Sequence, residues 1–166
     1  SRHEQADTQA PRPQGQRGQP RQAPQRLTDH RSAASFVSTQ QFTVTDEDTA
    51  IALGSGDVPV LATPRLLAWM EAATVAAARP HLDPSSTTVG IEVWMRHRRA
   101  SAVGAHVEVE VTEVTEQDRG LAFDVVAREV TEPPGDGGPG GIRAHEIASG
   151  RVVRAIVDRG SFLRGI

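Results

Sequence analysis

Residues 63–80 read TPRLLAWMEAATVAAARP, and this stretch decides the fold. Thr63 and Pro64 are typical of a helix start, with Thr63 as the N-cap and Pro64 as the first helical residue. Pro80 cannot continue the hydrogen-bond ladder, so we expect the helix to end near Arg79. Because almost every side chain between these ends is apolar, the sequence predicts a long helix that is enclosed on more than one side.

Glu71 is the only charged residue in the run from Leu66 to Ala78. A buried carboxylate loses much of its hydration free energy unless a partner compensates for it, so stability alone seldom explains such a residue. Glu71 is therefore the first candidate for a functional side chain. The alternative, which the sequence leaves open, is that Glu71 points through a gap to solvent.

Strand patterns occupy most of the rest of the chain. Between residues 105 and 112, apolar and polar side chains alternate, which is typical of a half-exposed strand. Residues 117–120 predict a hairpin turn, and Gly150 indicates a bulge or a close backbone approach within the last strand. Residues 133–141 are mostly Pro and Gly and predict a flexible loop. The strands are expected at about residues 35–45, 88–99, 105–112, 121–130 and 144–158.

The order of these elements is one strand, a long helix, and four strands joined by short turns or one loose loop. Successive strands joined by turns make an antiparallel sheet, and that sheet has to cover the apolar helix. We therefore predict an α+β protein with the hotdog fold, a curled antiparallel sheet wrapped round one long central helix. The predicted domain spans residues 34–166.

Residues 1–33 are predicted to form a disordered tail rich in Gln, Pro and Arg. This stretch contains almost nothing apolar to bury, so ordering it would cost conformational entropy without compensation. The alternative is an Arg-rich arm that binds an anionic partner.

Composition and charge argue against several classes of partner. Residues 1–33 carry six arginines against three acidic residues, a charge of +3, so the rest of a chain whose total charge is −3 carries −6. An acidic folded part argues against nucleic acid as the main partner. The chain has no cysteine, its six histidines show no metal-binding spacing, and no apolar stretch is long enough to span a membrane. We expect a soluble cytoplasmic protein without a metal.

Three polar side chains are expected to meet in such a fold: Thr63 at the helix start, Glu71 two turns further on, and His97. Alternation along the strand near residues 88–99 puts His97 on an apolar face that we expect to pack on the helix. The members of this face are Val89, Ile91, Val93, Met95 and His97. Each candidate also has a structural explanation, since Thr63 can be a simple N-cap, Glu71 can face solvent, and His97 can be exposed among arginines.

The same segments resemble those of a known family. Residues 60–73, VLATPRLLAWMEAA, resemble the helix start of the fluoroacetyl-CoA thioesterase-like hotdog family. Residues 88–91, TVGI, and residues 96–104, RHRRASAVG, are similar to the strand that follows the helix and to its turn. Residues 147–154, IASGRVVR, resemble the last strand. The resemblance extends over roughly residues 35–162.

The family's catalytic trio is a Thr, a Glu eight residues on, and a His twenty-six residues beyond the Glu. Thr63, Glu71 and His97 match both intervals. The resemblance implies a thioesterase acting on acyl-CoA or on an acyl-carrier protein, with no cofactor apart from the coenzyme A of the substrate. It also implies a homodimer with its sites near the interface, and Gly90 matches a glycine at the family's acyl pocket.

Three positions depart from the family pattern. The fluoroacetyl-specific members carry a phenylalanine gate six residues before the catalytic Thr, where this chain has Asp57. The usual histidine of the last strand is Val152, and the loop at residues 133–141 is longer than the family's tight turn. These differences leave the acyl group open.

Thioester hydrolysis gives each candidate a role. Glu71 is expected to act on water as a general base, or to attack the thioester directly and form an anhydride. His97 can polarise water or protonate the leaving sulfur, while the Thr63 hydroxyl can hold Glu71 or the acyl oxygen. Arg98 and Arg99 are expected to bind the phosphates of coenzyme A, for which a guanidinium fork is suited, unless they form only a solvated strand end.

Two alternatives to a thioesterase stay open. One is a hotdog dehydratase or hydratase, which needs an acid–base pair at other positions that the sequence does not offer. The other is a non-catalytic protein that binds acyl thioesters, an alternative that Asp57 and Val152 favour.

Overall fold

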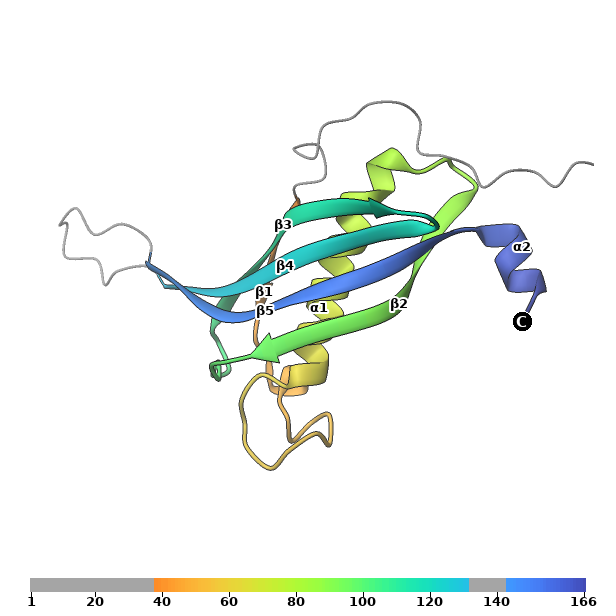
Figure 1. Cartoon of the computed structure of the whole chain (residues 1–166). Coiled ribbons are helices and arrows are strands. Elements are labelled where there is room, and N and C mark those ends of the chain that lie inside the picture. The colour runs from red at the N-terminus through yellow and green to blue at the C-terminus, as the bar shows by residue number, and fades with distance from the viewer. Residues whose placement is uncertain (1–37, 132–142) are drawn as a thin grey trace, which may run out of the picture.

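A five-stranded antiparallel sheet packs against one helix in the computed structural model, which describes residues 38–131 and 143–166 (Figure 1). The expected tail at residues 1–33 and the expected loop at residues 133–141 lie outside the described residues. The elements in chain order are β1 (Ser38–Thr43), η2 (Asp46–Asp48), α1 (Thr63–Ala78), η3 (Arg79–His81), β2 (Ser86–His97), β3 (His106–Gln117), β4 (Gly120–Thr131), β5 (Arg143–Asp158) and α2 (Arg159–Arg164).

The strand order is β1–β3–β4–β5–β2, and every neighbouring pair is antiparallel. Strand β2 is the next strand after the helix in sequence, but it lies at the edge of the sheet, where it pairs with β5 alone among the described strands. Figure 1 shows the curved sheet lying across α1. The predicted hotdog fold is therefore confirmed.

The core lies between α1 and the inner face of the sheet. Burial of each large aliphatic or aromatic side chain contributes roughly 1.5–3 kcal/mol, which is why one apolar helix can organise the whole sheet. Phe42 of β1 stacks on Trp69 of α1, with ring centroids 4.6 Å apart, and so joins the first strand to the helix. The largest fully buried side chains are Val44, Leu61, Leu66, Met70, Val107, Val109, Val111, Leu121, Phe123, Val125, Ile147 and Val152.

Two local predictions for the sheet are confirmed. Gln117 pairs with Gly120, so residues 118 and 119 form the hairpin turn between β3 and β4. Gly150 lies at a close backbone approach, because a Cβ built there would be 2.5 Å from the carbonyl oxygen of Trp94 on β2. Any side chain at position 150 would therefore force β5 and β2 apart.

Two expectations for the helix are corrected. The helix begins at Thr63, with Ala62 as the N-cap and Pro64 at the second helical position, one residue earlier than predicted. Its far side is also open, since Ala68, Ala72 and Val75 are exposed. A single chain therefore encloses the helix on the sheet side and leaves a row of small residues uncovered.

A bulge in β2 corrects the predicted alternation of that strand. Gly90 pairs with Arg154 and Glu92 with Val153, so Ile91 is an extra residue without a partner on β5. Opposite residues of an antiparallel pair share a face, and Val93 pairs with the buried Val152. The helix-facing side of β2 therefore carries Thr88 and Gly90 before the bulge and Val93, Met95 and His97 after it, without Val89 and Ile91.

Candidate active site

Glu71 forms an ion pair with Arg154 of β5, and its Oε1 lies 3.3 Å from Nη1 of the arginine. The Arg154 side chain is 7% exposed and the Glu71 side chain 39% exposed. Thr88 of β2 holds the same guanidinium, because Arg154 Nε donates to its hydroxyl at 2.9 Å and Nη2 donates to its carbonyl at 3.2 Å. The buried arginine is therefore fixed on two strands and presents one nitrogen to Glu71.

The charge balance at Arg154 explains why the pair forms. Burial lowers the pKa of the Arg154 guanidinium, and the charge and hydrogen bond of Glu71 oppose that effect. The sequence left open whether Glu71 is buried in the apolar helix or points through a gap to solvent. The Glu71 side chain is half-exposed, and the more deeply buried charge belongs to Arg154.

Gly90 lies against the Glu71 carboxylate. A Cβ at position 90 would be 2.5 Å from Glu71 Oε1, a distance that no side-chain carbon tolerates. The resemblance had placed Gly90 at the acyl pocket, and the structure adds that a glycine there lets the carboxylate reach the backbone of β2. This glycine, Arg154 and Glu71 meet at one point on the helix-facing side of the sheet.

Thr63 and His97 meet at the start of the helix, where the Thr63 hydroxyl lies 2.9 Å from His97 Nδ1. The other ring nitrogen, Nε2, is buried and has no hydrogen-bond partner among the described residues. Burial lowers the pKa of His97, and the backbone at Arg99 opposes this in part. The neutral imidazole is therefore favoured near pH 7, with one nitrogen held and the other available.

These two groups lie apart along the same helix and strand. Thr63 and Glu71 are two turns apart on α1, which corresponds to about 12 Å of helix. No hydrogen bond or ion pair joins Glu71 to His97 within residues 38–131 and 143–166. One chain therefore brings Thr63 to His97 and Glu71 to Gly90, without bringing the two pairs together.

The arginines near His97 differ in how they are engaged. Arg98 donates to the Glu146 carboxylate and, at 3.0 Å, to the Ser149 hydroxyl of β5. Arg99 is exposed at the end of β2. Arg65, at the helix start, pairs with Asp48 at 2.8 Å and so connects the first turn of α1 to the 3-10 helix η2.

Arg154 and Thr88 are the residues that sequence reasoning missed. Arg154 is the only charged residue in the apolar run VVRAIV at residues 152–157, just as Glu71 is the only one in its apolar helix run. A second lone charge in a buried run was therefore the available signal. Thr88 offered none, because its position on the inner face depends on the bulge that follows it.

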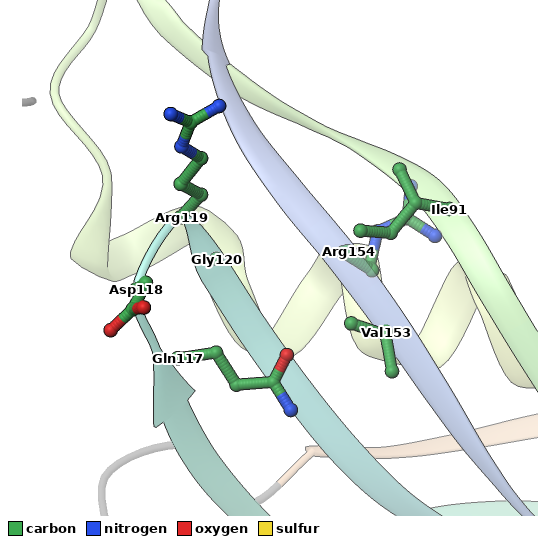
Figure 2. Close-up of a pocket in the computed structure, with 7 residues that line it drawn as sticks. All are labelled: Ile91, Gln117, Asp118, Arg119, Gly120, Val153 and Arg154. Atoms are coloured by element: carbon green, nitrogen blue, oxygen red, sulfur yellow. The ribbon is translucent and has the colours of Figure 1, made fainter.

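A separate pocket of about 580 Å³ lies beside the hairpin turn between β3 and β4 (Figure 2). In Figure 2, α1 lies behind the strands, so the pocket opens on the face of the sheet turned away from the helix. It does not include Thr63, Glu71 or His97, but it shares Arg154 with the Glu71 site. Its lining residues are Ile91, Gln117, Asp118, Arg119, Gly120, Val153 and Arg154.

Comparisons with known proteins place the chain in a family. The fluoroacetyl-CoA-specific thioesterase family matches residues 44–138. The chain belongs to this family. A search among curated proteins found no match.

Solved structures agree with this assignment. The fluoroacetyl-CoA thioesterase FlK is 26% identical, with a TM-score of 0.63 over 78% of this chain and 90% of that chain. A mutant of FlK in complex with fluoroacetate and CoA is 26% identical, with a TM-score of 0.62 over 76% of this chain and 94% of that chain. A Thermus thermophilus hypothetical protein, a thioesterase superfamily member, shares the fold at 21% identity, with a TM-score of 0.63 over 77% of this chain and 85% of that chain.

Two classes of feature are absent from the described part of the chain. No helix there is long and apolar enough to cross a membrane. No group of three or more His, Cys, Asp and Glu side chains gathers there as a metal ion would require.

Proposed function

We propose that this protein hydrolyses a small acyl thioester of coenzyme A or of an acyl-carrier protein, and that Glu71 activates the attack. The observation that best supports this is the position of the Glu71 carboxylate, which Arg154 holds against the backbone of Gly90 at the edge of the sheet. An oriented, half-exposed carboxylate beside a bare stretch of backbone suits a reaction in which water attacks a carbonyl at that point.

Hydrolysis requires one proton to leave water and one proton to reach the thiolate. Glu71 accepts the proton of water while the water oxygen bonds to the carbonyl carbon, and collapse of the oxyanion then breaks the carbon–sulfur bond. In the second route, Glu71 itself bonds to the carbonyl carbon, and water hydrolyses the resulting anhydride. In the first route, the proton accepted by Glu71 is proposed to pass to His97, held by Thr63, which relays it to the sulfur and returns to its neutral form. In the second route, the water that opens the anhydride is proposed to give its proton to His97, which relays it to the thiolate.

We propose that the two halves of the site come together in a homodimer formed through β2. The outer edge of β2 is unpaired in the described chain, and Ile91 and Trp94 are 64% and 57% exposed. Antiparallel pairing of two β2 strands, centred on Trp94 and skipping the bulge residue, brings the partner subunit's His97 opposite Gly90. Both side chains then lie on the helix-facing side, so Glu71 of one subunit meets the partner's His97.

The coenzyme A phosphates are proposed to bind at the end of β2. Arg99 is exposed there. Arg98 is already paired with Glu146, so it could contact a phosphate only by giving up that ion pair. Arg99 is therefore the better candidate of the two for a phosphate contact. Asp57, at the position of the family's phenylalanine gate, argues for an acyl group other than fluoroacetyl.

The activity is tested by thiol release from a panel of acyl-CoA substrates. We expect Glu71→Gln to lower kcat about 100-fold or more, because an amide neither accepts the proton nor attacks. Glu92→Gln is the matched control, since Glu92 is exposed on the same edge strand and points away from the helix. Binding without thiol release for every substrate would identify a non-catalytic acyl-thioester-binding protein instead.

The shared site is tested by combining two inactive chains. In a co-expressed mixture of Glu71→Gln and His97→Ala chains, each mixed dimer keeps one site with both wild-type residues. We expect the mixture to recover about a quarter of wild-type activity, since half of the dimers are mixed and each has one intact site. If each chain instead supplies all three residues of its own site, no recovery is expected, because every site then lacks either Glu71 or His97.

A further inference from the structure

The short C-terminal helix α2 carries apolar side chains that have no cover in one chain. Phe162, Leu163 and Ile166 are 40%, 60% and 90% exposed. The helix is nevertheless anchored at its start, because Asp158 Oδ1 accepts a 2.8 Å hydrogen bond from the backbone N–H of Ser161. A helix of six residues is too short to be stable by itself in water, so an ordered helix with an exposed apolar side suggests a docking partner.

The position of α2 links it to the edge strand. The backbone N–H of Arg159 donates to the carbonyl of Ser85 at 2.9 Å, which ties the start of α2 to the residue before β2. Figure 1 shows α2 beyond the ends of β5 and β2, away from the body of the sheet. Any strand that pairs with the free edge of β2 therefore ends near α2.

A second group of exposed apolar side chains lies at the opposite end of β2. Val103, in the turn after β2, is 43% exposed, and Ile51 and Val58, in the loop before α1, are 54% and 50% exposed. An isolated bridge between Val60 and Ala102 joins that loop to that turn. We call this group, Ile51, Val58 and Val103, the turn patch.

Antiparallel pairing of two β2 strands brings α2 and the turn patch together. In the register that sets the partner subunit's His97 opposite Gly90, Ser85 lies at the level of the partner subunit's Ala102. Because α2 is bonded to Ser85, it then lies beside the partner's Val103. A two-fold axis makes the same contact twice, which is how a self-complementary interface works.

Charge agrees with this arrangement. Arg159 and Arg164 belong to α2, whereas Asp46, Glu47 and Asp57 are exposed near Ile51 and Val58 in the loop before α1, and Arg99 is an exposed cation in the turn that leads to Val103. Opposite charges around an apolar contact favour the correct docking orientation.

We propose that α2 of each subunit docks on the turn patch of its partner and covers the end of the site where Thr63 and His97 meet. This inference rests on the dimer of the proposed function and adds an element to it. The occupant of the turn patch is thus a second copy of this chain, and its Phe162 and Leu163 provide the apolar contact. The helix then forms one wall of the path by which substrate reaches the partner's His97.

Cross-linking between copies tests the docking, and the chain suits it because it contains no cysteine. Phe162→Cys and Val103→Cys chains are co-expressed, so that a short bismaleimide can join the two positions only between copies. We expect a covalent dimer from this pair and none when Glu116→Cys, exposed on β3, replaces Val103→Cys. A Trp94→Cys chain tests the dimer separately, because the two copies of position 94 lie side by side at the proposed two-fold axis and are expected to cross-link.

The outcomes separate the two proposals. A Trp94→Cys cross-link without a Phe162–Val103 cross-link overturns the docking of α2 and leaves the dimer standing. Absence of both cross-links, with a monomer in sedimentation, overturns the dimer as well.

As a second measurement, we expect Leu163→Asp to raise the dimer dissociation constant about tenfold, whereas Leu163→Met leaves it unchanged. An unchanged constant in Leu163→Asp contradicts the docking even if that variant folds normally.

Discussion

The two ends of β2 hold their functional residues in different ways. At one end, Arg154 fixes Glu71 with a buried guanidinium that also bonds the hydroxyl and carbonyl of Thr88. At the other end, a single hydrogen bond joins Thr63 to His97, whose second ring nitrogen is unpartnered among the described residues. We call the end with Glu71 and Arg154 the complete end, because its hydrogen bonds are made within one chain. We call the end with Thr63 and His97 the open end, because one ring nitrogen of His97 is available to substrate or to a second subunit.

Gly90→Ala tests the complete end most severely. The added Cβ would lie 2.5 Å from Glu71 Oε1, so the carboxylate has to move. Because a displacement of about 1 Å can cost about 100-fold in rate, we expect kcat to fall by about that factor with little change in the melting temperature. In a Glu71→Gln background the same substitution is expected to cost nothing further, and an additional loss there would contradict the assignment.

Arg154→Met removes the anchor of the complete end. The substitution leaves the Thr88 carbonyl and hydroxyl without their buried donor, and we expect the free energy of unfolding to fall by about 2 kcal/mol. Arg151→Met is the matched control, because Arg151 lies on the same strand and pairs with Asp124 at 3.2 Å, with both side chains more than a third exposed. Exposed pairs contribute about 1 kcal/mol or less, so equal losses in urea denaturation would rule out a special role for Arg154.

Thr63→Val sharpens the account of the open end. The valine keeps the shape of threonine but removes the partner of His97 Nδ1, so the ring loses its orientation. Since Thr63 is exposed, we expect stability to change by less than about 0.5 kcal/mol, while kcat falls about tenfold. Thr63→Ser retains the hydroxyl and is expected to retain most of the activity, and steady-state kinetics of the pair would show whether the hydroxyl matters.

The smallest expected effect is on the pH dependence of stability. The pKa of His97 is lowered from 6.5 in the folded chain by burial, so below about pH 6.5 the unfolded chain takes up this proton more readily. Stability is therefore expected to decline as pH falls through that range, and the decline should be smaller in His97→Asn. Melting temperatures of both proteins across this range check the prediction, with His106→Asn as the control at an exposed histidine.

The sequence predicts the fold well because its strongest signal is local. The run from Leu66 to Ala78 defines the central helix, and the alternation at residues 105–112 defines a strand without knowledge of distant contacts. The site was predicted only in part, because Thr63 does contact His97 whereas Glu71, which was expected to meet His97, pairs with Arg154. Arg154 was missed because its role depends on a contact with Glu71, 83 positions earlier in the chain.

The prediction of which β2 residues face the helix was wrong for a different physical reason. Strict alternation groups Val89 and Ile91 with Val93, but one unpaired residue shifts the register by one, and no local signal near Gly90 announces the shift. The start of α1 was missed by one residue because Ala62, which cannot cap with its side chain, takes the N-cap position.

The bulge at Ile91 also limits what counting residues can reveal. Removing Ile91 would leave Thr88, Gly90, Val93 and His97 on their present face, because this residue stands outside the pairing with β5. A relative without it would keep the same arrangement in space while its histidine moved one position closer to the threonine in sequence. The number of residues between the threonine and the histidine therefore depends on whether the bulge residue is present. A sequence search that demands a fixed interval would overlook proteins with the same site.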